Sequence, residues 1–174
     1  MNKPLILVSN DDGISAPGIR ALIEVVREIG EVVVVAPDGP QSGMGHAITL
    51  NSTLRCDQIH IDDGAQIEYA CSGTPVDCVK LAVSTIMDRK PDLCVSGINH
   101  GSNSSINVIY SGTMSAAVEG ALEGIPSVGF SLIDYSHDAD FTASKEIVRT
   151  IVNKVLKEGL PKGSCLNVNI PNLA

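Results

Sequence analysis

Short apolar runs alternate along this chain with segments in which apolar residues recur every three or four positions. The first run covers residues 5–8, an amphipathic stretch follows from Pro17 to Ile29 and ends at Gly30, and a second run covers residues 31–36. Continuous short apolar runs are typical of buried parallel strands, and the three-to-four spacing is typical of a helix packed on a sheet. The first fifty residues therefore predict a β-α-β unit with a right-handed crossover.

The same alternation continues to the end of the chain. It predicts further strands at 93–96, 127–131 and 166–170, and helices that begin near residues 74 and 111 and over about 142–158. The first of these helices has a strong start signal, with Thr74 as N-cap, Pro75 at the first helical position and Asp77 at the third. The expected fold is α/β, with a mostly parallel sheet in a single domain over residues 1–174.

Residues 47–71 interrupt this alternation. Residues 47–50 are strand-like, and residues 58–61 and 66–71 flank the turn signal Asp62-Asp63-Gly64. Two strands joined by a short acidic and glycine-containing turn predict an antiparallel excursion beside the main sheet.

Composition narrows the class of protein. Aliphatic residues must build the core, because 44% of the residues are hydrophobic and only 3% are Phe, Tyr or Trp. The formal charge of −8 excludes a polynucleotide partner, which would require a basic stripe for the phosphates. No apolar run reaches the length of a membrane span, so no membrane partner is expected. Five cysteines without a C-x-x-C pair predict reduced thiols and a cytoplasmic protein, with Cys78 and Cys94 packed as small hydrophobic residues.

Polar residues follow three of the predicted strands. Asp11 and Asp12 come directly after the first, Ser42 lies in the Gly- and Pro-rich loop after the second, and Asn99 follows the strand at 93–96. Ligands of open α/β sheets bind beyond the carboxyl ends of the strands, and adjacent carboxylates repel unless a cation offsets their charge. These oxygen ligands favour Mg²⁺ or Mn²⁺, with Ca²⁺ as an alternative. The competing interpretation is an ordinary Asn-Asp-Asp-Gly turn.

A helix start offers donors for a phosphate. Ser111, Gly112 and Thr113 open the helix near residue 111, where unpaired backbone N–H groups can bind an anion. The alternative is a plain Ser or Thr N-cap. Tyr110 is a candidate to stack on a base, and His100 is expected to be a hydrogen-bonding surface group.

The ordered set of motifs resembles the SurE (survival protein E) family of metal-dependent nucleotidases. The matching segments, which follow the family order over essentially the whole chain, are Ser9-Asn10-Asp11-Asp12-Gly13, Ala36-Pro37 with Gln41-Ser42-Gly43, Ser72-Gly73-Thr74-Pro75 with Asp77, Ser96-Gly97-Ile98-Asn99 with Gly101 and Asn103, and Tyr110-Ser111-Gly112-Thr113. The resemblance implies a Rossmann-like three-layer sandwich. It also implies a divalent metal on Asp11, Asp12, Ser42 and Asn99, and phosphate contacts from Asn10, Gly43, Asn99, Ser111, Gly112 and Thr113.

The implied activity is hydrolysis of nucleoside 5′-monophosphates, with 3′-monophosphates and short polyphosphates as further candidate substrates. Asp11 or Asp12 would orient or deprotonate the attacking water, with a phospho-aspartate intermediate as the alternative. The family forms homodimers or homotetramers with a carboxyl-terminal extension that these 174 residues are expected to lack. The chain departs from the family at Asn107-Val108-Ile109, where an acidic residue is usual, and at Ser104-Ser105-Ile106, where a glycine is common.

Four other functions compete with this hypothesis. A non-catalytic receiver-like switch needs a phosphorylatable Asp at a later strand end, where this chain has Asn99. A dinucleotide-dependent oxidoreductase needs G-x-G-x-x-G in the first turn, and an Asp-nucleophile phosphatase needs Asp-x-Asp; neither motif is present there. A metal-binding assembly module remains as the alternative without catalysis.

Overall fold

A seven-stranded sheet forms the centre of the computed structural model, which describes residues 3–136 and 138–172. The strand order is β3-β4-β2-β1-β5-β6-β7, and all neighbouring pairs are parallel except β3 and β4. The strands are β1 (Leu5–Ser9), β2 (Glu31–Pro37), β3 (Cys56–Ile59), β4 (Ile67–Cys71), β5 (Leu93–His100), β6 (Ser127–Ile133) and β7 (Cys165–Pro171). The chain winds outward in both directions from β1, so the carboxyl ends of β1 and β5 flank the topological switch point where such sheets bind ligands.

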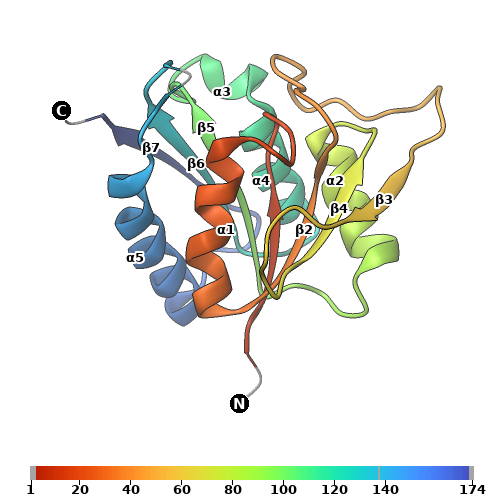
Figure 1. The fold of residues 1–174 in the computed structure, drawn as a ribbon, viewed down its shortest axis with the longest axis horizontal. Coiled ribbons are helices and arrows are strands. Elements are labelled where there is room, and N and C mark those ends of the chain that lie inside the picture. The colour runs from red at the N-terminus through yellow and green to blue at the C-terminus, as the bar shows by residue number, and fades with distance from the viewer. Residues whose placement is uncertain (1–2, 137, 173–174) are drawn as a thin grey trace.

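Helices cover both faces of this sheet, which confirms the three-layer α/β prediction. The helices are α1 (Pro17–Ile29), α2 (Pro75–Leu81) with a π-helical continuation η1 (Ala82–Ile86), α3 (Asn107–Tyr110), α4 (Gly112–Leu122) and α5 (Thr142–Glu158). Figure 1 shows α1 and α5 on one face and α2 and α4 on the other. Alternate residues of β1 supply the two cores, because Ile6 and Val8 pack on the α1 and α5 side and Leu7 packs on the α2 and α4 side.

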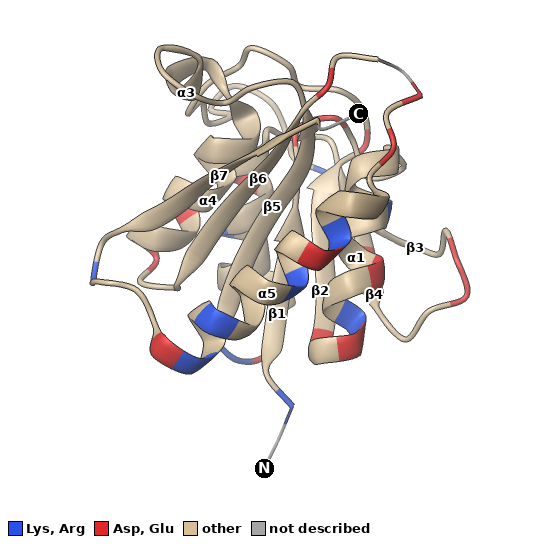
Figure 2. Cartoon of the chain, turned by 90° about the vertical axis from the view of Figure 1, so that its left-hand side faces the viewer, with Lys and Arg blue, Asp and Glu red and all other residues tan. Residues whose placement is uncertain are grey.

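The α1 and α5 layer carries much of the molecule's charge (Figure 2). Lys145 pairs with Glu24, and Arg149 lies 2.6 Å from Glu28, so ion pairs join the outer surfaces of the two helices. Within the residues that the structure describes, no helix has both the length and the apolarity that a membrane span requires.

The predicted antiparallel excursion is confirmed, since β3 and β4 pair antiparallel and β4 continues the parallel sheet beside β2. The prediction that residues 47–50 are strand-like is wrong. Thr49 donates from its backbone N (3.1 Å) and its hydroxyl (2.6 Å) to the carboxylate of Asp77, and Leu50 is 79% exposed. The segment therefore bonds to a helix cap instead of a neighbouring strand.

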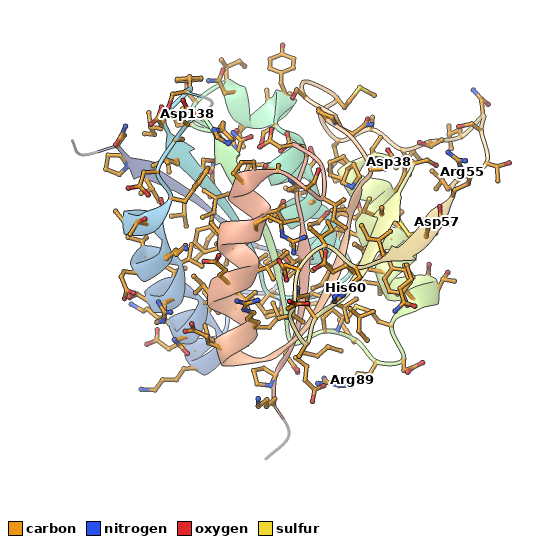
Figure 3. All side chains as sticks on the ribbon, viewed as in Figure 1. Asp38, Arg55, Asp57, His60, Arg89 and Asp138 are labelled. Carbon is orange, nitrogen blue, oxygen red and sulfur yellow. A yellow bond between two sulfur atoms is a disulfide. The ribbon has the colours of Figure 1, made fainter. Side chains whose placement is uncertain are left out.

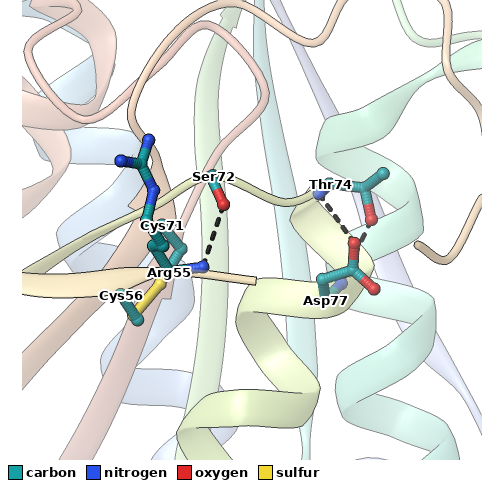
Figure 4. Close-up of a disulfide and its surroundings, with 6 residues drawn as sticks. All are labelled: Arg55, Cys56, Cys71, Ser72, Thr74 and Asp77. Atoms are coloured by element: carbon teal, nitrogen blue, oxygen red, sulfur yellow. Dashed lines mark hydrogen bonds between the residues drawn. A yellow bond between two sulfur atoms is a disulfide. The ribbon is translucent and has the colours of Figure 1, made fainter. Parts of the chain in front are cut away.

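The helix start at Thr74 is confirmed in detail. The Thr74 hydroxyl accepts a bond from Asp77 N (3.1 Å), and Thr74 N donates to the Asp77 carboxylate (2.9 Å), as Figure 4 shows. This reciprocal capping box satisfies two donors at the first turn of α2.

A disulfide contradicts the prediction that all five cysteines are thiols. Cys56 and Cys71 are bonded (Figure 4), because the antiparallel register of β3 and β4 places them directly opposite each other with their Cα atoms 4.1 Å apart. Counting cysteines could not show a pairing that depends on strand register. The other three cysteines are free, and Cys78 and Cys94 are buried as expected.

The strand predicted at 93–96 extends to His100, and α3 was not predicted at all. The register of β5 against β6 shifts between Ser96 and Asn99, and a cis peptide bond links Gly97 and Ile98. Gly97 has φ of +121°, and a Cβ there would lie 2.3 Å from the carbonyl oxygen of Phe130. The strand therefore continues past the small residues that indicated its end, and it carries Asn99 with it.

Candidate metal and phosphate site

The turn after β1 holds two carboxylates at the carboxyl edge of the sheet. Asn10 Nδ2 donates to the carbonyl of Gly13 (2.8 Å), and Gly13 has φ of +98°, a conformation that glycine adopts readily. Asp11 is 5% exposed, and Asp12 is half-buried. Turn chemistry accounts for Asn10 and Gly13, but it does not account for burying Asp11 beside a second acidic residue.

The start of α4 binds the carboxylate of Asp11. Gly112 N donates to Oδ2 (3.1 Å), and the Thr113 hydroxyl donates to Oδ1 (2.5 Å). The approach is so close that a Cβ on Gly112 would lie 2.5 Å from the Cβ of Asp11. Ser111 acts as the N-cap, because its Oγ accepts a bond from Met114 N (3.0 Å). Two of the donors expected for phosphate therefore bind an aspartate here, and their role toward phosphate stays a prediction.

The acidic pair has an unfavourable electrostatic environment. Burial raises the pKa of Asp11 to about 6, the Thr113 hydroxyl partly offsets this, and the neighbouring charge of Asp12 raises it further. Burial also raises the pKa of Asp12, while the His100 ring and backbone act in the opposite direction. Across residues 3–136 and 138–172, no Lys, Arg or His forms an ion pair with either carboxylate. A bound cation would supply the missing positive charge.

Neutral oxygens near the strand ends also fit a hard cation. Asn10 Oδ1 is buried and has no hydrogen-bond partner in the described structure. The bonds of the Asn99 side chain leave from Nδ2, to the carbonyls of His100 and Gly101 (both 3.0 Å) and to Asn103 Oδ1 (3.3 Å), which keeps its oxygen available as a ligand. The described residues contain no cluster of three His, Cys, Asp or Glu side chains. Two carboxylates together with neutral oxygens are the ligand types that hard cations prefer.

The loop that carries Ser42 is fixed on both sides of that residue. On one side, Gln41 N donates to the carbonyl of Asp11 (2.7 Å). On the other, Gly45 N donates to the carbonyl of Tyr110 (3.2 Å), and His46 Nε2 lies 2.9 Å from the buried carboxylate of Glu119. Ser42 itself is exposed. The turn after β1 and the last residue of α3 therefore hold the two ends of a three-residue span that includes Ser42 and Gly43.

Asp12 and Ser42 open onto a cleft of about 490 Å³. Its other walls include Asp38, which follows β2 and is labelled in Figure 3, together with His100 and Tyr135. A cleft of this size can hold a small organic ligand. The structure thus brings Asp12 and Ser42 together at one cleft, and it places Asp11 behind them against α4.

Sequence reasoning missed the contributions of His100 and Tyr135 to this cleft. His100 is half-buried, and its ring packs edge-on against Phe141 with a centroid distance of 5.1 Å. Tyr135 follows β6, the strand next to β5, so its position after a strand end was the signal that could have identified it. Tyr110, the expected base-stacking residue, lies on α3 and does not line this cleft.

Comparison with known proteins identifies the family of this chain. The family model "Survival protein SurE" matches residues 6–174. The 5′-nucleotidase SurE of Christiangramia forsetii is 67% identical over 172 residues, which cover 98% of this chain and 66% of that protein. The enzyme of the same name from Flavobacterium psychrophilum is 68% identical over 171 residues, with 98% of this chain and 66% of that protein covered. The chain thus spans just under two thirds of the length of these curated relatives.

A solved structure extends the match to three dimensions. The crystal structure of the SurE protein from Aquifex aeolicus superposes with a TM-score of 0.87 at 45% sequence identity, covering 98% of this chain and 67% of that one. The fold, the order of the motifs and the match over residues 6–174 lead to one conclusion: this chain belongs to the SurE family.

Proposed function

We propose that this protein is a divalent-metal-dependent phosphomonoesterase that hydrolyses nucleoside 5′-monophosphates to nucleosides and phosphate. The observation that carries the proposal is the buried Asp11 beside Asp12 at the end of β1, without an ion-pair partner in the described structure. Relatives that are 67% and 68% identical carry the name 5′-nucleotidase. Nucleoside 3′-monophosphates and short polyphosphates are secondary candidate substrates.

The charge of the cleft supports the need for a cation. Asp12 and Asp38 line it, and the described lining residues include no Lys or Arg. A phosphate monoester carries up to two negative charges near neutral pH, so these carboxylates alone would repel it. Asp11, Asp12, Ser42 and Asn99 would hold Mg²⁺ or Mn²⁺, with Ca²⁺ as the alternative ion. When bound, such an ion supplies Lewis-acid polarisation of phosphate and water.

The chain's own residues would position the reacting groups. One carboxylate, Asp11 or Asp12, would orient the attacking water and accept its proton. Asn10, Gly43 and Asn99, together with the Ser111, Gly112 and Thr113 donors, would bind the phosphate oxygens and stabilise their negative charge. Gly112 N and Thr113 Oγ1 donate hydrogen bonds to Asp11, so these donors would have to divide their bonds between Asp11 and phosphate, or exchange one partner for the other.

The proposal includes a cytoplasmic location and a homodimeric or homotetrameric state. Three free cysteines support a reducing compartment, and the disulfide between Cys56 and Cys71 argues against it. The exposed apolar side chains Ile106 and Ile109 on and beside α3, and Leu122 at the end of α4, support an interface with a second copy.

The test is phosphate release from a panel of nucleoside monophosphates by metal-stripped protein, before and after Mg²⁺ or Mn²⁺ is added. We expect turnover only with metal and a loss of at least about 100-fold in Asp12→Asn. Asp63→Asn is the matched control, because Asp63 also follows an aspartate in a turn but is fully exposed away from the site. Metal binding by calorimetry without turnover would refute the phosphatase and favour a metal-binding module without catalysis.

A further inference from the structure

Tyr135 is exposed yet fixed in position. The residue is 75% exposed. The hydroxyl accepts a bond from Ser102 N (3.2 Å), and the ring lies so close to Gly101 that a Cβ there would come within 2.3 Å of the ring atom Cε1. One edge and one end of the ring are therefore held by the segment after β5, while most of the ring surface faces outward.

Tyr135 borders the candidate active site. Tyr135 and its neighbour Ser136 line the same cleft as Asp12 and Ser42. Tyr135 is also the only Phe, Tyr or Trp among the cleft-lining residues that the structure describes. Asp38 adds a carboxylate to the wall, so the cleft beyond the metal site suits a neutral group better than a second phosphate.

We propose that Tyr135 is the platform on which the base of a nucleoside monophosphate stacks, an inference that rests on the proposed phosphatase function. A base offers a flat π-face, and an aromatic ring already fixed by Ser102 and Gly101 can receive it without losing further side-chain freedom. Stacking is tolerant of base identity, since every base has such a face. The platform therefore selects nucleotides over simple sugar phosphates, and it discriminates little between bases.

The kinetic test compares two substrates that share a phosphate and a ribose but differ in the base. AMP and ribose 5-phosphate are assayed with the metal-loaded wild type and with Tyr135→Leu. We expect the variant to raise KM for AMP by about 5- to 150-fold, the range that removal of one stacking contact gives, and to change KM for ribose 5-phosphate by less than about twofold. Tyr135→Phe keeps the ring and should stay close to the wild type for both substrates.

Tyr110→Leu is the matched control, because Tyr110 is another exposed tyrosine, at 60%, that does not line the cleft. It should leave the ratio of the two KM values unchanged. An equal rise in KM for AMP and for ribose 5-phosphate in Tyr135→Leu would overturn the platform, because it would indicate a general effect on the site. A shift of the KM ratio in Tyr110→Leu, with none in Tyr135→Leu, would also overturn it.

A binding measurement separates failure of this inference from failure of the proposed activity. The chain has three tyrosines, so ring-labelled protein gives a spectrum in which the Tyr135 signals are assigned by their loss in Tyr135→Leu. AMP should shift the Tyr135 ring resonances through its ring current, while ribose 5-phosphate should not. If the wild type releases no phosphate but AMP shifts the Tyr135 resonances, the proposed phosphatase activity is wrong and the proposed base stacking on Tyr135 is supported. If Tyr135 does not respond to AMP, the platform is wrong whatever the turnover.

Discussion

Replacing Arg20 with Met should cost far more stability than replacing any arginine on the outer surface. Arg20 on α1 donates from both terminal nitrogens to Glu68 on β4, at 2.7 and 2.8 Å, and Glu68 is only 2% exposed. Gln66 Nε2 adds a third bond to the same carboxylate (2.8 Å). In Arg20→Met the carboxylate stays buried without its cation, which costs about 3–5 kcal/mol.

That loss corresponds to a melting temperature lower by about 6–20 °C for a domain of this size. The assay is chemical and thermal unfolding of the metal-free protein. Arg149→Met is the control, because Arg149 lies 2.6 Å from Glu28 on the outer surface, where solvent screening leaves an ion pair with little effect on stability. The double variant Arg20→Met, Glu68→Met should recover most of the loss, since it removes both charges. An Arg20→Met protein no less stable than Arg149→Met would refute the reasoning.

Three further predictions concern the site and its supports. Gly112→Ala places a Cβ 2.5 Å from that of Asp11, so calorimetry should show Mn²⁺ affinity at least about tenfold weaker, whereas Gly39→Ala, whose added Cβ meets no atom within 4 Å, should bind normally. Burial alone would raise the pKa of Asp77, but bonds from Thr49 and Thr74 more than offset it and lower that pKa. Asp77 therefore stabilises the fold when the pH is above the pKa of about 3.9 that it has in the unfolded chain. This stabilisation is lost as the pH falls through the lower pKa that Asp77 has in the folded protein. Asp77→Asn should accordingly be about 1 kcal/mol less stable at pH 7, and in urea titrations it should approach the wild type as the pH falls below the folded pKa of Asp77. Thiol titration in denaturant should count three free cysteines, rising to five on reduction, and reduction should lower the unfolding free energy by about 3 kcal/mol for a loop of this length.

The layered fold could be predicted from the sequence because its signals are local and strong. The apolar run at 5–8, the periodicity of α1 and the Thr74 capping box each specify an element within a few residues. Because strands and helices alternate along the chain and β-α-β crossovers are right-handed, few sheet topologies are possible. Asp11, Asp12 and Asn99 could also be identified as candidate site residues from the sequence. Each follows or ends a predicted strand, and the carboxyl ends of parallel strands lie at one edge of the sheet.

Several of the features that sequence reasoning missed depend on contacts between distant segments. Thr49 donates a hydrogen bond to Asp77, and the register of β3 against β4 brings Cys56 opposite Cys71. Gly112 donates a hydrogen bond to Asp11, which lies 101 positions earlier in the sequence. β5 extends past Gly97 because β6 continues to pair with it beyond the register shift. None of these partners is marked by composition or spacing near the residue itself.

The fixed ends of the loop around Ser42 limit how this protein can change by insertion or deletion. Gln41 and Gly45 are bonded to the turn after β1 and to the residue before Ser111, so only the three residues between them can adjust. Adding or removing one residue there would displace Ser42 relative to Asp12 or break one of the two attachments. Residues 50–53, by contrast, are exposed and follow the Thr49 contact with Asp77. We therefore expect insertions and deletions among family members to occur at these residues. Within the connection between β2 and β3, one half is thus open to evolutionary lengthening, and the other is held to a constant length by its two backbone attachments.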